Sequence, residues 1–570
     1  MPLARHPHRY PHMLSLLAPL ATLLAHPALA SAEQGASFAG DKPILSNPFR
    51  AGRSTTMSRH GIVASSHVLA SQAGIDLLRN GGNAVDAALA AAATLAVVEP
   101  MMTGPGGDVF VLYYEAKSGK IYALNGSGRS PLGLSREHFS DKKKIPASGW
   151  ESVTVPGAVS AWTALHERFG RNPMPEVLAP AIRYAEEGYA VTEIVASVWL
   201  NILQADELAK ETWLIDGKTP KAGQLFKNPR LGHALRLIAE GGHDAFYKGE
   251  IAEEIVRWSQ ETGGFLSMQD FANHTANWVE PIHTNYRGYE VYQYPPNGQG
   301  IGALIMLNIL EGYDLASMQL GSPEYIHLLV EAKKLAYADL HRYVADPEGS
   351  DIPVEELLSK DYAAKRRALI QPGHALPAVE PGEFGGSDTI YLTAIDSEGN
   401  AVSLVNSQSG DWGAGVSAGN MGFTLQDRGA GFTLEPGHPN EYAPGKRPFH
   451  TLLAGMMTKD EKLYWSFGLM GGDMQPQGHV QLITSHIDGG LTVQQAADRP
   501  RWRHSHDKVF LEWGHSAAAV DALKSWGHKV SLGGGPASGY GGAQIIMVDP
   551  ETGTYFGASD PRKDGAALGY

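Results

Sequence analysis

The sequence predicts an α+β protein with a helix-rich first part and a strand-rich second part. Apolar residues recur at helical spacing between about residues 150 and 370. The clearest of these stretches are 158–169, 175–188 and 301–315. Beyond this region, 389–395 and 401–405 alternate like strands across a polar turn, and glycine-rich turns follow. With 43% apolar and 19% charged residues, the 570-residue chain can bury a large core.

The first 32 residues are predicted to be a signal peptide. Arg5 and Arg9 give a basic start, residues 13–25 form an apolar run, and small residues between 28 and 32 supply a cleavage site. The apolar run is too short to span a bilayer, which needs about 20 residues. We therefore expect an exported protein, periplasmic or secreted, without a membrane span.

Composition excludes several chemistries. The chain has no cysteine, which excludes disulfides, thiolate metal sites and a cysteine nucleophile. Its formal net charge of −14 disfavours sequence-independent binding to nucleic acid.

The remaining elements follow in order along the chain. Residues 61–98 are expected to form two helices separated by a glycine stop, the second, 84–97, being buried on nearly all sides. Residues 109–114 and 121–124 are expected to be strands, and 364–386 is the best linker candidate. Two further helices are expected near 478–489 and 492–498.

Common catalytic signatures are mostly missing. The sequence contains no H-E-x-x-H, no phosphate-binding P-loop and no G-x-S-x-G elbow. The run His504-Ser505-His506-Asp507 could suggest a metal site, but no partner ligands occur at recognisable spacing, so a solvated loop is the favoured interpretation.

One residue that could carry chemistry is Thr389, which opens a strand directly after the linker. Such a threonine is commonly explained by β-propensity alone. The functional alternative is an N-terminal nucleophile. If the Asp388–Thr389 bond is cut, the freed α-amine can take the proton of the same residue's hydroxyl, so no separate histidine is needed. Paired backbone N–H groups from Gly471 and Gly472 are candidate oxyanion donors.

Several ordered blocks resemble the γ-glutamyltranspeptidases (glutathione hydrolases). The blocks are residues 81–88, 99–107, 389–402, 444–448, 471–473 and 557–562, in the right order from about residue 55 to the C-terminus. The resemblance implies a four-layer αββα sandwich of the N-terminal-nucleophile hydrolases, made as one precursor. Cutting before Thr389 would give a large subunit of residues 33–388 and a small subunit of residues 389–570, interleaved in one core and without a cofactor.

The resemblance also implies roles for particular residues. Thr389 would attack the amide carbonyl, Ser407 falls on the supporting hydroxyl that is usually threonine, and Gly471 and Gly472 fall on the oxyanion pair.

Substrate-binding positions depart from the family pattern. The arginine that holds the glutamyl carboxylate falls on Ser127, and Arg129 follows two residues later. The acid that binds the glutamyl α-amine falls on Gly431. The assisting asparagine falls on Ser409, and the carboxylate-binding serine pair falls on His450 and Thr451. One hypothesis is that Arg129, Arg428 and His450 rebuild an equivalent anion site, since arginine presents a planar fork to carboxylates.

Three functions follow from these residues. The first is an exported, self-cleaving threonine amidohydrolase for γ-glutamyl or similar amides, with transfer to amino acid or peptide acceptors as a lesser activity. The pattern of losses is similar to the glutathione hydrolase-like and cephalosporin-acylase-like branch, so an acylase for glutaryl-type or other N-acyl amides is the alternative. A non-catalytic exported binding protein on the same fold is the alternative from another class.

Overall fold

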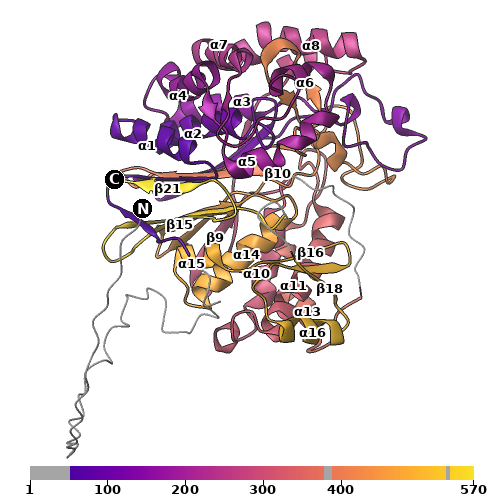
Figure 1. Ribbon diagram of the computed structural model, residues 1–570. Helices are drawn as coiled ribbons and strands as arrows, with labels where there is room; N and C mark the ends of the chain where they lie inside the picture. The colour runs from indigo at the N-terminus through magenta and orange to yellow at the C-terminus, as the bar shows by residue number, and fades with distance from the viewer. Residues whose placement is uncertain (1–51, 378–387, 534–538) are drawn as a thin grey trace, which may run out of the picture. The chain divides into compact units, whose positions relative to one another are not determined.

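The computed structural model describes residues 52–377, 388–533 and 539–570, and these form two sheets stacked between two layers of helices (Figure 1). Each sheet has seven strands, and every pairing within them is antiparallel. The four-layer αββα architecture implied by the family resemblance is therefore confirmed.

The first sheet, here called the β10 sheet, carries the candidate nucleophile. Its strands, in spatial order, are β21 (Ala566–Gly569), β2 (Ile62–Ser65), β10 (Asp388–Ile395), β11 (Ala401–Ser409), β3 (Asp108–Glu115), β4 (Lys120–Gly126) and β7 (Asn277–Val279). β10 and β11 lie between strands that precede residue 388 in sequence. Both predicted subunits therefore contribute to one continuous sheet.

The second sheet, here called the β15 sheet, is interleaved in the same way. Its strands, in spatial order, are β1 (Thr56–Ser58), β20 (Tyr555–Ser559), β19 (Ala543–Val548), β15 (Lys462–Leu469), β14 (Gly455–Lys459), β9 (Tyr289–Gln293) and β8 (Ile282–Tyr286). Apolar side chains of both sheets meet between them, among them Phe110, Tyr391 and Met456. This shared core joins the two halves of the chain.

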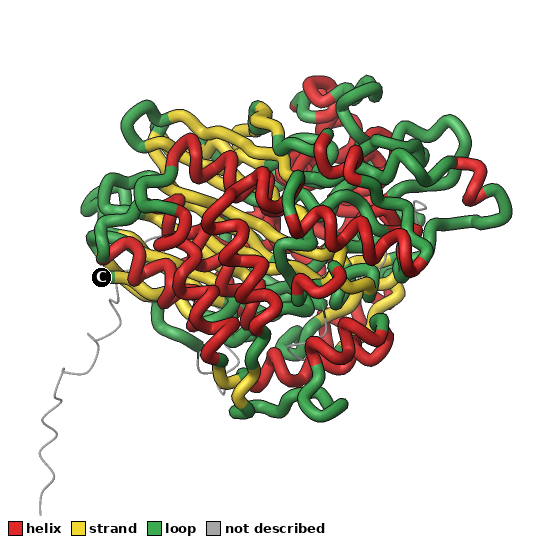
Figure 2. The backbone as a smooth tube through the Cα atoms, turned by 90° about the horizontal axis from the view of Figure 1, so that it is seen from above, coloured by secondary structure: helices red, strands yellow, loops and turns green. Residues whose placement is uncertain are grey.

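The helices that cover the β10 sheet come from the first part of the chain (Figures 1 and 2). They are α1 (Val68–Arg79), α2 (Ala84–Val98), α3 (Ala158–Phe169), α4 (Met174–Glu187), α5 (Glu193–Val198), α6 (Glu207–Trp213), α7 (Pro229–Tyr247), α8 (Glu250–Thr262) and α9 (Met268–Ala272). Every residue of α2 is buried, as its Ala, Val and Leu composition predicts, and Asn83 closes its first turn in a capping box with Asp86.

The helices on the β15 sheet come from both parts of the chain. They are α10 (Gly300–Leu310), α11 (Pro323–Tyr343), α12 (Val354–Leu357), α13 (Lys360–Arg367), α14 (Met474–Ile487), α15 (Val493–Asp498) and α16 (Ala517–Ser525). A small sheet of β16 (Trp502–Ser505), β17 (Lys508–Leu511) and β18 (Lys529–Leu532) lies beside them.

Three sequence predictions need correction. The region 61–98 begins with β2, because its four buried residues pair with β10 and β21. The mainly helical region contains β7, β8 and β9, whose short runs become strands only by pairing with distant partners. The linker candidate 364–386 begins inside α13, and residues 378–387 lie outside the described residues.

The solvated-loop interpretation of the run 504–507 holds only for its second half. His504 and Ser505 end β16, and the His504 side chain is buried, while His506 and Asp507 form the turn into β17, with His506 exposed.

The predicted signal peptide also lies outside the described residues. In the part of the chain that the structure describes, no helix has the length and hydropathy needed to cross a membrane.

Candidate active site

Thr389 and Ser407 face each other where β10 and β11 are locally out of register. Asp388 pairs with Ser409 and Ile390 with Asn406, so one residue of β10 stands opposite two of β11. Such bulges re-aim side chains and are common beside active sites. Thr389 is fully buried, and its hydroxyl donates to Ser407 Oγ at 3.2 Å. The two hydroxyls that the family resemblance pairs are in contact.

Arg428 lies directly behind this pair. Its Nη2 donates to Ser407 Oγ at 2.8 Å, and its Nη1 donates to Thr451 Oγ1 at 2.7 Å. Burial lowers the pKa of Arg428 to about 10, and the carboxylates of Asp108 and Asp427 oppose this shift. The guanidinium is therefore a cation at neutral pH. Its Nε–H is buried and has no acceptor among the described residues.

His450 is held as a neutral side chain. Its Nε2 lies 2.9 Å from Asp108 Oδ2, and its Nδ1 accepts from the backbone N–H of Leu452 at 3.2 Å, so Nε2 carries the proton. Burial and the charge of Arg428 lower the pKa of His450 to about 4, against the opposing effect of Asp108. A neutral His450 whose N–H meets Asp108 offers no positive charge to an anion site.

Asp108 anchors several segments of the site. It stands opposite Ser407 in the β3–β11 ladder. One carboxylate oxygen accepts from the backbone N–H groups of Gly128 and Gly157 and from Gln426, while the other meets His450. These donors fix the position of the buried carboxylate. It supplies the negative charge that Arg428 faces.

The candidate oxyanion pair is tied to the same network through Gln299. Gln299 Nε2 donates to the carbonyl oxygens of both Thr451 and Gly472, the latter at 2.8 Å. Gly471 and Gly472 have φ angles of 119° and 56°, which glycine tolerates best. Neither N–H donates a hydrogen bond to a residue that the structure describes. Two backbone donors are thus left open for a ligand.

Ser409 and Gly431 belong to the same neighbourhood but offer different chemistry. The Ser409 N–H donates to Ser407 Oγ at 2.8 Å, and Asp427 interacts with the Ser409 side chain. At Gly431 a Cβ would lie 2.8 Å from the carbonyl oxygen of Phe449, so the backbone leaves no room for an acidic side chain. Burial raises the pKa of the Asp427 carboxyl, while the Gly410 N–H and Arg428 oppose the shift.

Arg129 is engaged elsewhere. Its Nη2 lies 2.8 Å from both carboxylate oxygens of Glu348, and its Nη1 lies 3.5 Å from Asp346 Oδ2. Its Nη1 also donates to the carbonyl of Gly445. Its guanidinium therefore already has two carboxylate partners, whereas Arg428 has an open donor.

A chain of direct contacts thus joins Thr389, Ser407, Arg428, Thr451, Gln299 and Gly472. The γ-glutamyltranspeptidase family model matches residues 70–570. The chain belongs to the γ-glutamyltranspeptidase family.

Family relatives cover nearly the whole chain. The "Glutathione hydrolase-like YwrD proenzyme" of Bacillus subtilis (strain 168) is 40% identical over 89% of this chain and 98% of its own length. The "Oxamate amidohydrolase proenzyme" of Klebsiella pneumoniae subsp. pneumoniae is 34% identical over 91% and 100%. The crystal structure of cephalosporin acylase from Bacillus halodurans superposes with a TM-score of 0.87, at 39% identity, over 92% of this chain and 98% of that chain. The protein is therefore an enzyme of the γ-glutamyltranspeptidase family, with both hydrolase and acylase relatives.

One buried cluster outside this site has metal-ligand residue types. His327 and Glu331 of α11 and His528 lie with their ligand atoms within 4.8 Å of one another. The Lys334 ammonium lies 2.7 Å from Glu331 Oε1, and the Leu376 N–H donates to Oε2, so the carboxylate already has a cation and a donor. A divalent ion added there would face the ammonium, and this cluster fits a hydrogen-bonded clamp better than a metal centre.

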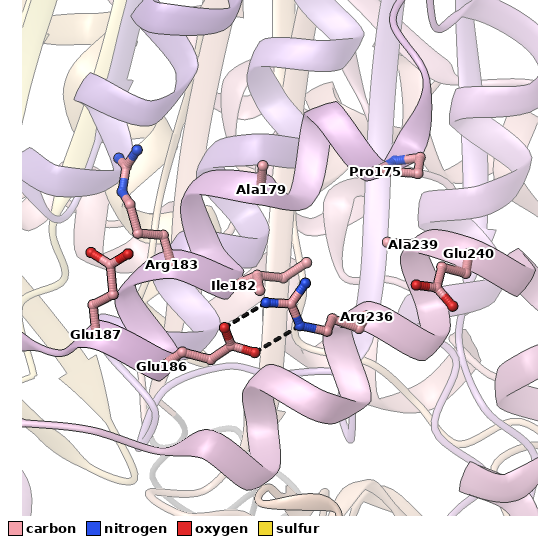
Figure 3. A pocket seen from close by; sticks show the side chains of 9 residues that line it. All are labelled: Pro175, Ala179, Ile182, Arg183, Glu186, Glu187, Arg236, Ala239 and Glu240. Atoms are coloured by element: carbon pink, nitrogen blue, oxygen red, sulfur yellow. Dashed lines mark hydrogen bonds and ion pairs between the residues drawn. The ribbon is translucent and has the colours of Figure 1, made fainter.

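A groove of about 330 Å³ between α4 and α7 shares no residue with the Thr389 network (Figure 3). Among its charged groups, Arg236 makes a two-pronged ion pair with Glu186. None of its lining residues is a histidine or a hydroxyl nucleophile. It adds nothing to the amide chemistry.

Three site residues escaped the sequence analysis: Asp108, Gln299 and Asp427. Each acts on residues far away in sequence, as in the contact between Asp108 and His450 across 342 positions. A weak signal existed in Asp427, which stands directly before the charged Arg428, and in Asp108, which follows the Gly106-Gly107 turn.

Proposed function

We propose that the protein is an autoprocessed N-terminal-threonine amidohydrolase that cleaves amides of carboxylate-bearing acyl groups. In this proposal the Asp388–Thr389 bond is cut, and residues 389–570 form a small subunit that begins with the nucleophile. The large subunit ends at Asp388. The single observation that supports it most is the contact of a buried arginine with the Thr389–Ser407 hydroxyl pair.

The reaction uses groups already in place. The freed α-amine of Thr389 takes the proton of its own hydroxyl, and Oγ1 attacks the amide carbonyl carbon. The negative charge that develops on the carbonyl oxygen is received by the open N–H groups of Gly471 and Gly472. The amine leaves with the proton, and water then hydrolyses the threonyl ester. An amine acceptor in place of water gives transfer as the lesser activity.

The acyl group is assigned from Arg428 and Gly431 together. The open Nε–H of Arg428 is a charge-assisted donor for a carboxylate on the acyl chain. Gly431 offers no acid for an α-amine, and its surroundings exclude one. A glutaryl-type acyl group, which has the carboxylate and lacks the amine, fits both features.

A second candidate is a γ-glutamyl amide. Asp427 favours it, because this buried carboxyl contacts Ser409 beside the nucleophile and could receive an α-amine instead. The names of relatives, one glutathione hydrolase-like and one an acylase, agree with either acyl group.

Processing is tested by intact mass and N-terminal sequencing of the purified protein. We expect two chains, one beginning at Thr389, and we expect the other to begin near residue 33 if the predicted signal peptide is removed on export. Thr389→Ala should leave a single chain with no amide hydrolysis. A wild-type protein that stays uncut and is silent on every amide would overturn the proposal and favour the exported binding protein.

Acyl preference is tested with glutaryl-4-nitroanilide and γ-glutamyl-4-nitroanilide, which differ in the α-amine. A higher kcat/KM for the glutaryl compound supports the primary assignment. A higher value for the γ-glutamyl compound, lost in Asp427→Asn, would transfer the assignment to the second candidate.

A further inference from the structure

A second buried cation lies on the other side of the candidate oxyanion loop. Lys333 of α11 is only 3% exposed, and its ammonium pairs with no carboxylate in the part of the chain that the structure describes. Its Nζ lies 3.8 Å from the centre of the Tyr337 ring and donates weakly, at 3.3 Å, to Nδ1 of His504. A buried charge without an ion pair is costly unless a ligand completes it.

Arg503 adds a second cation to this region. Its guanidinium lies over the Phe510 ring at 5.1 Å and against Gly539. Its Nε is buried without an acceptor, and it forms no ion pair with a described carboxylate. Arg503 is half-buried, so the region is reachable from solvent.

Asp473 places both cations beside the oxyanion loop, because it directly follows Gly472. The Asp473 carbonyl oxygen accepts from the Tyr337 hydroxyl and, at 2.9 Å, from Gln477 Nε2, and Gln477 also binds the backbone of His504. Both Lys333 and Arg503 act electrostatically on the Asp473 carboxyl. Two cations thus face one carboxylate, which leaves a net positive charge next to Gly471 and Gly472.

The position of Lys333 and Arg503 indicates which half of an amide substrate they would contact. Arg428, Ser409 and Gly431 lie with the supporting hydroxyl and are assigned to the acyl half. Gln299 links this acyl side to the oxyanion loop, since it donates to the carbonyl oxygens of Thr451 and Gly472. Oxyanion donors bind the carbonyl oxygen between the two halves of an amide. Groups beyond the oxyanion loop therefore meet the leaving or accepting amine.

We propose that Lys333 and Arg503 form a subsite for a carboxylate on the amine half of the substrate, as in an amino acid or a peptide. The inference rests on the proposed amide cleavage at Thr389 and names the second half of its substrate. The carboxylate would take the open Arg503 donor and approach the Lys333 ammonium.

The test compares two anilides that share an acyl group, the 4-nitroanilide and the 3-carboxy-4-nitroanilide, prepared with both glutaryl and γ-glutamyl groups. The ratio of kcat/KM, carboxylated over plain, is measured in wild type and variants. One charge-assisted contact corresponds to roughly a tenfold change or more, so Lys333→Met and Arg503→Met should each lower this ratio about tenfold. The matched control is Lys529→Met, which removes an exposed charge from neighbouring β18 and should leave the ratio within about twofold.

An unchanged ratio in both Lys333→Met and Arg503→Met would overturn the subsite while leaving amide cleavage intact. Arg503→Met keeps the test open if the buried Lys333 variant does not fold. If neither acyl group is cleaved, equilibrium dialysis tests the subsite without catalysis. The protein should then bind 5-amino-2-nitrobenzoate but not 4-nitroaniline, and either cation variant should lose that binding. Equal binding of both compounds, or of neither, would refute the subsite.

Discussion

Arg428 and Lys333 are both buried cations beside the candidate oxyanion loop, but their surroundings differ sharply. Arg428 has two hydroxyl acceptors and two nearby carboxylates, whereas Lys333 has a histidine nitrogen, an aromatic ring and no ion pair. Burial lowers the pKa of both, to about 10 for Arg428 and about 8 for Lys333. The comparison separates a cation whose charge nearby carboxylates already balance, with one N–H open to a ligand, from a cation that pairs with no described carboxylate.

The largest expected effect is on stability and follows from removing the Arg428 cation. Arg428→Met leaves Asp108 and Asp427 without their shared positive charge and removes the donor to Ser407 and Thr451. Breaking a buried ion network of this kind typically costs about 3–5 kcal/mol. We expect the free energy of unfolding to fall by about that amount, measured by urea denaturation in the uncut Thr389→Ala background.

The comparison between Arg428 and Lys333 would be wrong if Arg428→Met left the free energy of unfolding unchanged or raised it. In that case the two cations would be equivalent, and Asp108 and Asp427 would not balance the charge of Arg428. Arg236→Met is the control, because Arg236 pairs with Glu186 in an exposed setting and should change stability by less than about 1 kcal/mol.

We expect Lys333→Met to change the free energy of unfolding in the opposite direction, by raising it. Its pKa falls from 10.5 to about 8 on folding. The unfolded state therefore binds the proton more tightly between those values, and wild-type stability rises with pH across that window. Below pH 8 the wild type carries the full cost of burying the charged Lys333 ammonium, about 3 kcal/mol. We expect the methionine variant to be more stable at pH 7.

The same variant sharpens the comparison through its pH dependence. The stability advantage of Lys333→Met over wild type should be constant below about pH 8 and should shrink towards pH 10.5. Urea midpoints at pH 7 and pH 10 measure this difference directly. An advantage that stays the same at both values would show that packing, and not the buried charge, is responsible.

Local sequence patterns predicted much of the fold. The periodic stretch 158–169 coincides with α3, and the alternating runs at 389–395 and 401–405 lie within β10 and β11. Strands β7, β8 and β9 were missed, because runs of three to five residues become strands only when a distant partner supplies their hydrogen bonds.

The candidate site likewise contains residues that the sequence predicted and residues that it did not. Thr389, Gly471 and Gly472 were predicted from the sequence and Ser407 from the family resemblance, and Thr389 and Ser407 are in contact. Asp108 gave only a weak signal in the sequence and Lys333 gave none, because each acts through tertiary contacts. The protonation of His450 is equally invisible there, since burial and Arg428 determine it.

The smallest expected effect concerns the hydroxyl through which Arg428 meets the nucleophile. Ser407→Ala removes one of the two acceptors of the guanidinium and the partner of the Thr389 hydroxyl, but Thr451 still holds Nη1. The loss of one charge-assisted contact predicts about a tenfold fall in kcat/KM on the preferred anilide. Ser407→Thr keeps the hydroxyl and should retain activity within about threefold, because only a methyl group is added beside the contact. If both variants were equally impaired, shape at position 407 would matter more than its hydroxyl. Arg428 would then act on the acyl group alone, and its link to Thr389 through Ser407 would have no catalytic consequence.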